Sequence, residues 1–155
     1  MTQYSAPERI KNSAPSFRNV VNVTGATLVL TADDSGTLYR LNRAAGIAVT
    51  LPAIGADDVG IRYRFFVQTT FTGDLTITAA TADLLLGAVA MVDTDTGNAT
   101  VTLSPDGTDD LILTCGGVTT GGLVHSVFDF EAISIAGWLI TGVNRHSGNV
   151  ATPFS

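Results

Sequence analysis

Apolar and polar residues alternate in four consecutive segments between residues 37 and 79, with short turn-forming links between the segments. In the clearest of these, 61–68, the odd positions are all apolar, whereas two arginines and a glutamine occupy even positions. A period of two over several neighbouring segments is typical of strands with one buried face. The pattern therefore predicts a meander of antiparallel strands, to which the rest of the chain adds further strands.

Segments of similar character lie on both sides of this region. Residues 20–24 and 27–31, joined by Gly25-Ala26, predict a tight hairpin, and 133–143 predicts a closing hairpin in which Trp138 fills the core or an interface. The apolar run 84–92 fits a buried strand or a short helix, and Gly87 favours the strand. With about ten short strands and no long amphipathic helix, the expected fold is all-β: a single antiparallel β-sandwich or jelly-roll-like domain over residues 20–143.

The two ends of the chain are polar and differ from this domain. Residues 144–155 read as a C-terminal tail, and residues 1–19 read as an extended N-terminal arm interrupted by Pro7 and Pro15. The arm is either a disordered terminus or a segment that becomes ordered on a partner surface. Three of the chain's eight basic side chains lie in it, and with two apolar anchors they form the candidate contact set: Arg9, Ile10, Lys11, Phe17 and Arg18.

Composition and charge narrow the function. The chain has 22 threonines but only two glutamates and one lysine, which favours sheets and turns over exposed helices. A net charge of −6 argues against nucleic acid as a partner. No run of 18 apolar residues predicts a membrane span, and the N-terminus does not resemble a secretory signal. We therefore expect synthesis in the cytoplasm, from which the protein could leave as part of a particle.

No motif predicts catalysis, a cofactor or a transition-metal site. Cys115 is the single cysteine and is expected to be a small buried hydrophobe. The glycine-rich stretch 116–122 leads into a predicted strand, 123–130, without a lysine, so it does not fit a phosphate-binding loop. His125 is expected on that strand and His146 in the tail, and neither belongs to a recognisable catalytic motif with a serine or cysteine nucleophile. The oxygen donors of 93–98 loosely follow a calcium loop but lack its distal glutamate, which leaves ion binding there open.

Three Asp-Asp pairs lie in predicted loops, and four arginines lie on or beside predicted strands. These charges fit solvated turns, a symmetric subunit interface or, as an enzymatic rival, paired carboxylates for glycoside hydrolysis. Two arginines that point outward from one strand beside an aromatic ring are unusual in so acidic a chain. The interface hypothesis assigns six residues to subunit contact: Arg40, Arg62, Arg64, Phe66, Asp57 and Asp58.

The strand pattern also resembles that of a known group of proteins. A strand that ends in a Leu-Pro step at 51–52, a glycine-led strand at 60–67 and a late Trp-containing strand at 137–142 are similar to segments of small β-rich bacteriophage virion proteins. The resemblance extends over residues 36–143 and implies a head decoration (cement) protein. Such proteins are commonly trimeric, bind the outer surface of the capsid and have no catalytic residue or cofactor. Similar segments occur in tail and fibre proteins, so a tail, fibre or carbohydrate-binding receptor module is the alternative.

Together these observations predict a structural virion protein and not an enzyme. Three copies are expected to pack around a threefold axis on the outer capsid surface, with the major capsid protein as the second partner. The arm 1–19 would reach the capsid below and help to link neighbouring capsomers, which stabilises the head.

Overall fold

The computed structural model describes residues 19–95 and 99–155, and this part of the chain is built from strands with one short 3-10 turn, η1 (Ala32–Asp34). The all-β prediction is confirmed. The strands are β1 (Asn19–Val23), β2 (Thr27–Val29), β3 (Thr37–Leu41), β4 (Ile47–Thr50), β5 (Arg62–Val67), β6 (Leu75–Thr78), β7 (Leu84–Asp93), β8 (Val101–Leu103), β9 (Ile112–Cys115), β10 (Val127–Ser134) and β11 (Gly137–His146).

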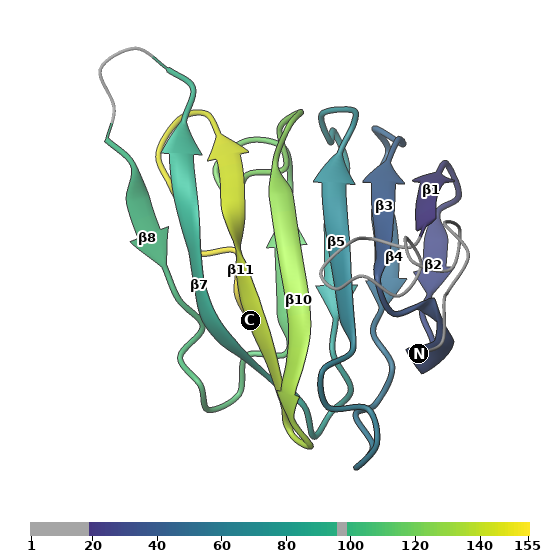
Figure 1. Cartoon of the computed structure of the whole chain (residues 1–155). Helices are drawn as coiled ribbons and strands as arrows, with labels where there is room; N and C mark the ends of the chain where they lie inside the picture. The colour runs from purple at the N-terminus through teal and green to yellow at the C-terminus, as the bar shows by residue number, and fades with distance from the viewer. Residues whose placement is uncertain (1–18, 96–98) are drawn as a thin grey trace, which may run out of the picture.

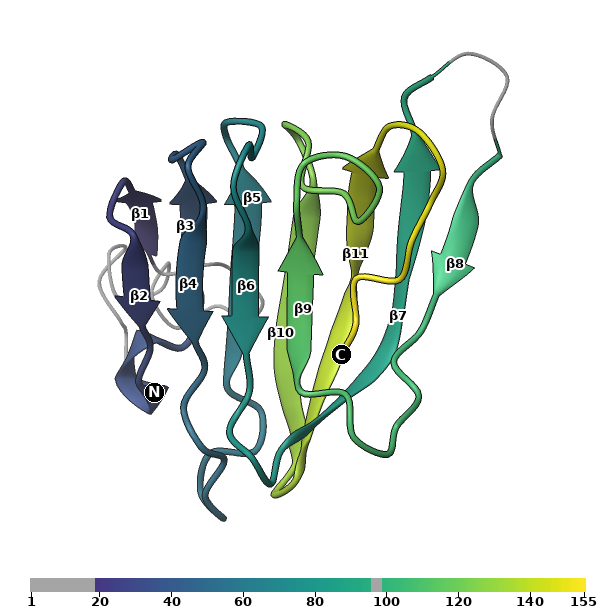
Figure 2. The same cartoon turned by 180° about the vertical axis from the view of Figure 1, so that it is seen from behind.

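The strands form two layered sheets. A seven-stranded sheet has the order β1-β3-β5-β10-β11-β7-β8, and a four-stranded sheet has the order β2-β4-β6-β9. Figure 1 shows the seven-stranded sheet in front, and Figure 2 shows the four-stranded sheet covering the half that contains β1, β3, β5 and β10. Loops and the C-terminal residues lie over the other half, which contains β11 and β7 (Figure 2).

The first six strands alternate between the two layers. β1, β3 and β5 pair in parallel in one sheet, while β2, β4 and β6 pair in parallel in the other. The predicted antiparallel meander is therefore wrong, and of the nine strand pairs of the described chain five are parallel and four antiparallel. The physical reason is that a period of two reports which face of a strand is buried, whereas it does not report which strand lies beside it.

The predicted hairpin at Gly25-Ala26 is also wrong. This link carries the chain from β1 in one layer to β2 in the other, and the carbonyl of Ala26 accepts a hydrogen bond of 2.8 Å from the backbone N–H of Ala48. A short link containing glycine between β-branched segments fits a corner between two layers as well as it fits a hairpin.

Each of the four antiparallel pairs includes at least one strand from the second half of the chain. β10 pairs with β5 and with β11, so the closing hairpin is confirmed, and the run from residue 84 forms strand β7. β10 begins only at Val127, so the prediction that His125 lies on a strand is wrong. His125 has a φ of 73°, the only positive φ among the described non-glycine residues, and lies in the turn before the strand.

Aromatic rings occupy the centre of the core between the layers. Tyr39 stacks on Phe65 with ring centroids 5.6 Å apart, and Phe65 meets the edge of Phe130 at 5.7 Å. Tyr63 and Trp138 lie 5.8 Å apart, and both are fully buried, which places Trp138 in the core. Burial raises the pKa of both tyrosines. These rings stabilise the fold and offer no exposed platform on which a sugar could stack.

Cys115 is fully buried, as expected, and burial raises the pKa of its thiol to about 12. The thiol is therefore protonated and shielded near neutral pH, which makes it a poor nucleophile. Beside it, the glycine-rich stretch forms a loop that Asn144 holds: Asn144 Oδ1 accepts from the N–H of Gly122 at 2.8 Å, and its Nδ2 donates to the carbonyl of Thr120 at 2.9 Å. Gly121 has a φ of 85° and packs against Asn144 so closely that a Cβ would overlap it. The glycines thus serve packing.

The chain ends on the four-stranded sheet. β11 extends to His146, and residues 153–155 then pair with β9 through an antiparallel bridge between Leu113 and Phe154. Phe154 itself is buried in the core. The last residues therefore cover the β9 edge of this sheet.

Candidate functional site

The outer face of the seven-stranded sheet carries most of the positive charge of the described chain. Alternation along β3, β5 and β11 turns Arg40, Arg62, Arg64 and Arg145 away from the buried core. Only Arg43, in the link after β3, lies elsewhere among the five described arginines. Two acids, Asp129 and Glu131 on β10, share the face. Its formal charge is therefore four minus two, or +2, in a protein whose net charge is −6.

Apolar side chains lie between these charges. Rows of registered residues cross the sheet, and one of them runs Arg40, Phe66, Val127, Val143 and Ala90. Val143 is 44% exposed, and Val20 on the edge strand β1 is 59% exposed. Arginine and aromatic residues are enriched at protein interfaces, and here they lie beside exposed apolar side chains.

Two of the arginines predicted at an interface are held by contacts within the sheet. Arg64 forms a bidentate ion pair with Asp129, in which Nε donates to Oδ1 at 2.6 Å and Nη2 donates to Oδ2 at 2.8 Å. Both side chains remain over 30% exposed, so the pair adds at most about 1 kcal/mol to stability. Arg40 donates from Nε and Nη2 to Oε1 of Gln68. Both guanidinium groups are thereby fixed in position on the face.

A small cluster at one end of the face includes two residues that the sequence did not assign to it. The ring of Phe66 stacks on His125, with centroids 6.0 Å apart, and Arg145 Nη1 lies 3.4 Å from His125 Nδ1. Arg145 also donates to the carbonyl of Val124 at 2.9 Å. His125 is exposed, and its positive φ costs backbone energy. The N–H of His125 donates to the carbonyl of Val67 at 2.8 Å, and this bond helps to hold the strained turn.

The other predicted contact residues are not on this face. Asp57 and Asp58 lie in the loop between β4 and β5, where Asp58 Oδ2 accepts from the N–H of Gly55 at 2.9 Å. The structure thus brings Arg40, Arg62, Arg64 and Phe66 together on one face and places the two acids in a separate loop. The proposed capsid contacts of residues 9, 10, 11, 17 and 18 lie outside the described residues.

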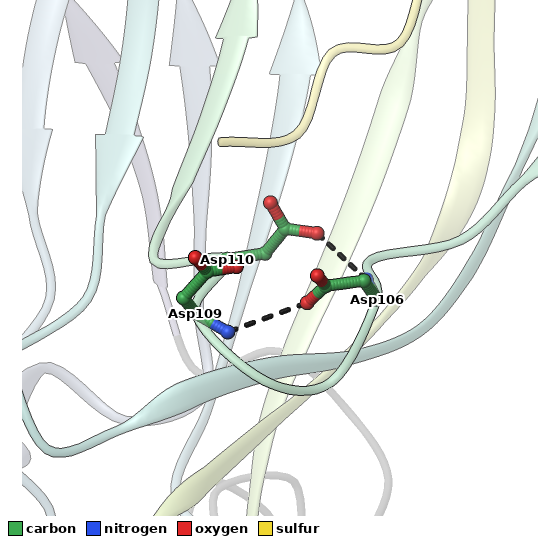
Figure 3. A group of neighbouring side chains, drawn as sticks. All are labelled: Asp106, Asp109 and Asp110. Carbon is green, nitrogen blue, oxygen red and sulfur yellow. Dashed lines mark hydrogen bonds between the residues drawn. The ribbon is translucent and has the colours of Figure 1, made fainter.

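Three aspartates converge in the loop between β8 and β9. Asp106, Asp109 and Asp110 each have a carboxylate oxygen within 4.8 Å of the other two (Figure 3). In the described part of the chain, no other group of three or more histidine, cysteine or acidic side chains meets this criterion for a metal site. Their oxygens already serve the loop, since Asp106 accepts from the N–H groups of Thr108 and Asp109, and Asp110 accepts from the N–H of Asp106. These bonds account for the geometry as a turn, so the cluster is not assigned as a metal site.

From the hydrogen bonds to Asp106 we predict how this loop responds to pH. Hydrogen bonds from the Thr108 N–H, its hydroxyl and the Asp109 N–H lower the pKa of Asp106 to about 2. The stabilising effect of the ionised carboxyl is therefore present above its unfolded value of about 3.9 and is lost as the pH falls towards 2. We expect the amide signals of Thr108 and Asp109 to titrate together near pH 2 in NMR spectra. A midpoint near pH 4 would contradict these contacts, and Asp106→Asn should remove the transition.

Comparison with known proteins gave no match to a family model, a curated protein or a solved structure. Within residues 19–95 and 99–155, no helix has the length and hydropathy that a membrane span requires.

Proposed function

We propose that this protein is a structural virion protein, a capsid decoration or cement protein that binds the outer capsid surface and links capsomers. The observation that carries the proposal is the outer face of the seven-stranded sheet, where four arginines, Phe66 and exposed valines gather on an acidic protein. Such a face suits association with other proteins, because arginine and aromatic side chains supply most of the binding energy at interfaces. The resemblance of the strand pattern to phage decoration proteins supports the same role.

In this proposal the protein acts as a homotrimer, in which the outer face of each copy contacts the acidic turns of the next copy. The acidic turns of one copy, Asp57 and Asp58 among them, provide charges complementary to the arginines of another. We propose in the same way that the two layers form a β-sandwich or jelly-roll-like domain, in which the first six strands alternate between the layers. The major capsid protein is the second partner, reached by the N-terminal arm.

Sedimentation with empty capsids tests this function. The full chain should sediment with the capsids up to a fixed number of copies per capsomer and should raise the temperature at which the capsids break. Absence of the protein from the pellet at saturating concentration would contradict a decoration role. Binding to isolated tails instead would favour the tail or fibre alternative.

Deleting residues 1–18 separates the two proposed contacts. The shortened chain keeps β1 and every described strand, so it should fold and retain the oligomeric mass of the full chain. It should lose capsid binding, because the arm supplies three basic and two apolar contact residues. Capsid binding that persists with unchanged affinity would refute the role of the arm while leaving the oligomer unaffected.

A further inference from the structure

A pocket lies where β7 and β11 end, on the same side of the seven-stranded sheet as the buried core. It has a volume of about 190 Å³, and the residues that matter in it are Asp93, His146, Asn149, Val101 and Val150. His146 and Asp93 occupy the last positions of their strands. They point to the same side as the buried side chains of Asn144 and Met91, because they lie two residues further along the same strands.

His146 is the unusual member of the pocket. Its side chain is only 2% exposed, and neither ring nitrogen has a hydrogen-bond partner within the described chain. A buried polar group without a partner destabilises the folded state, and such a group calls for a specific explanation. The backbone fixes its position, since the carbonyl of His146 accepts from Thr94 N–H at 2.9 Å and from Thr94 Oγ1 at 3.0 Å.

Asp93 is the direct partner of His146 in the parallel pair of β7 and β11. Registered residues of neighbouring strands are about 4.8 Å apart and present their side chains on the same face. The carboxylate is oriented by the N–H of Asp95, which donates to Oδ1 at 2.8 Å, and Asp95 is tied in turn to the N–H of Gly148 at 2.9 Å. An imidazole and an oriented carboxylate therefore come from registered positions of neighbouring strands and line the same pocket.

We propose that Asp93 and His146 form a binding site for a divalent first-row transition-metal ion, with water at the remaining coordination positions. Imidazole nitrogen and carboxylate oxygen together are common ligands of Zn²⁺, Co²⁺ and Ni²⁺, whereas Ca²⁺ and Mg²⁺ select oxygen alone. A bound ion would engage a ring nitrogen that otherwise has no partner. The pocket has room for several waters, since a cavity needs only about 10–15 Å³ of such space to hold one.

This site is distinct from the outer face and from the three aspartates between β8 and β9. It does not depend on the proposed capsid role, since a metal here would join the ends of β7 and β11 in a single copy. The preference for nitrogen ligands predicts an order of affinity in which Ni²⁺ and Zn²⁺ bind more tightly than Mn²⁺, and Ca²⁺ binds weakest.

The test uses the full chain without an affinity tag, titrated with Zn²⁺ by calorimetry and with Co²⁺ by visible absorption. We expect one ion per chain, and we expect His146→Gln and Asp93→Asn each to weaken binding at least tenfold. Two matched controls, His125→Gln and Asp109→Asn, remove a histidine and an acid from other places and should bind as the unchanged protein does. Thermal unfolding of each variant, measured without metal, checks that it is folded.

A second readout needs no variant. Ring ¹⁵N signals of the unchanged protein should shift for His146 on addition of Zn²⁺, while those of exposed His125 stay in place. Absence of binding, binding that survives both His146→Gln and Asp93→Asn, or a zinc-induced shift at His125 alone would overturn the proposal. Loss of binding in Asp109→Asn with retention in His146→Gln would overturn it as well and place the ion among the three aspartates.

Discussion

Replacing Phe65 with alanine will cost about 3–5 kcal/mol of the free energy of unfolding, the range for a fully buried phenylalanine. Phe65 is inaccessible to solvent and lies between Tyr39 and Phe130, so the truncation removes two aromatic contacts and leaves a cavity between the layers. Urea denaturation followed by circular dichroism measures the loss. A single domain of this size has a total stability of about 5–15 kcal/mol, so the variant will be close to unfolding.

The next residue provides the control. Phe66 lies on the opposite face of β5, is partly exposed and stacks on His125 at 6.0 Å. Phe66→Ala should therefore lower stability by about 1 kcal/mol or less, the value of one aromatic contact at a surface. Equal losses for the two variants would mean that both rings are buried, and the assignment of the outer face would then be wrong. Under the proposed function, Phe66→Ala should instead weaken association.

If the protein associates through its outer face as proposed, reversing the charge of Arg40 will weaken self-association at least tenfold. Arg40 is exposed on the outer face, beside Phe66 in the registered row, and its guanidinium group is held by Gln68. Arg40→Glu places a carboxylate where the proposal puts the acidic turns of another copy, so attraction becomes repulsion. The dissociation constant of the oligomer, from sedimentation velocity over a range of concentrations, measures the effect.

Arg43→Glu is the matched control, because it changes the net charge by the same two units, from −6 to −8. Arg43 lies in the link between β3 and β4 and donates to the carbonyl of Gly46. Its reversal should leave the dissociation constant within about twofold of the original. If the two variants weaken association equally, the effect belongs to net charge, and the outer face is not the interface.

The sequence predicted correctly which face of a strand is buried, but it did not predict which strands pair with one another. Alternation in 61–68 placed Tyr63, Phe65 and Val67 in the core, where all three are fully buried. It could not reveal that the strands before and after this segment lie in the other layer, because a strand buried on one face shows the same period in either arrangement. Parallel pairing between β3 and β5 depends on where the links on either side of β4 direct the chain, and the turn residues in those links do not specify that direction.

The candidate sites also contain residues whose positions follow from local alternation and residues whose positions depend on strand pairing. Outward arginines on β5 could be predicted, since their positions follow from the alternation of that strand alone. Arg145 was expected in a tail because the residues after Val143 are polar, yet β11 continues to His146 and brings Arg145 to His125. The pairing of Asp93 with His146 depends on the register between β7 and β11, which lie far apart in the chain. Local patterns carry no information about such a register.

The most direct test of the proposed role is the mass of the full chain in solution, measured by sedimentation equilibrium at micromolar to millimolar concentration. The proposal that this protein works by association through its outer face predicts three times the chain mass of 16.1 kDa, reduced towards 16.1 kDa by Arg40→Glu. A mass of 16.1 kDa for the unchanged protein at the highest concentration would contradict it.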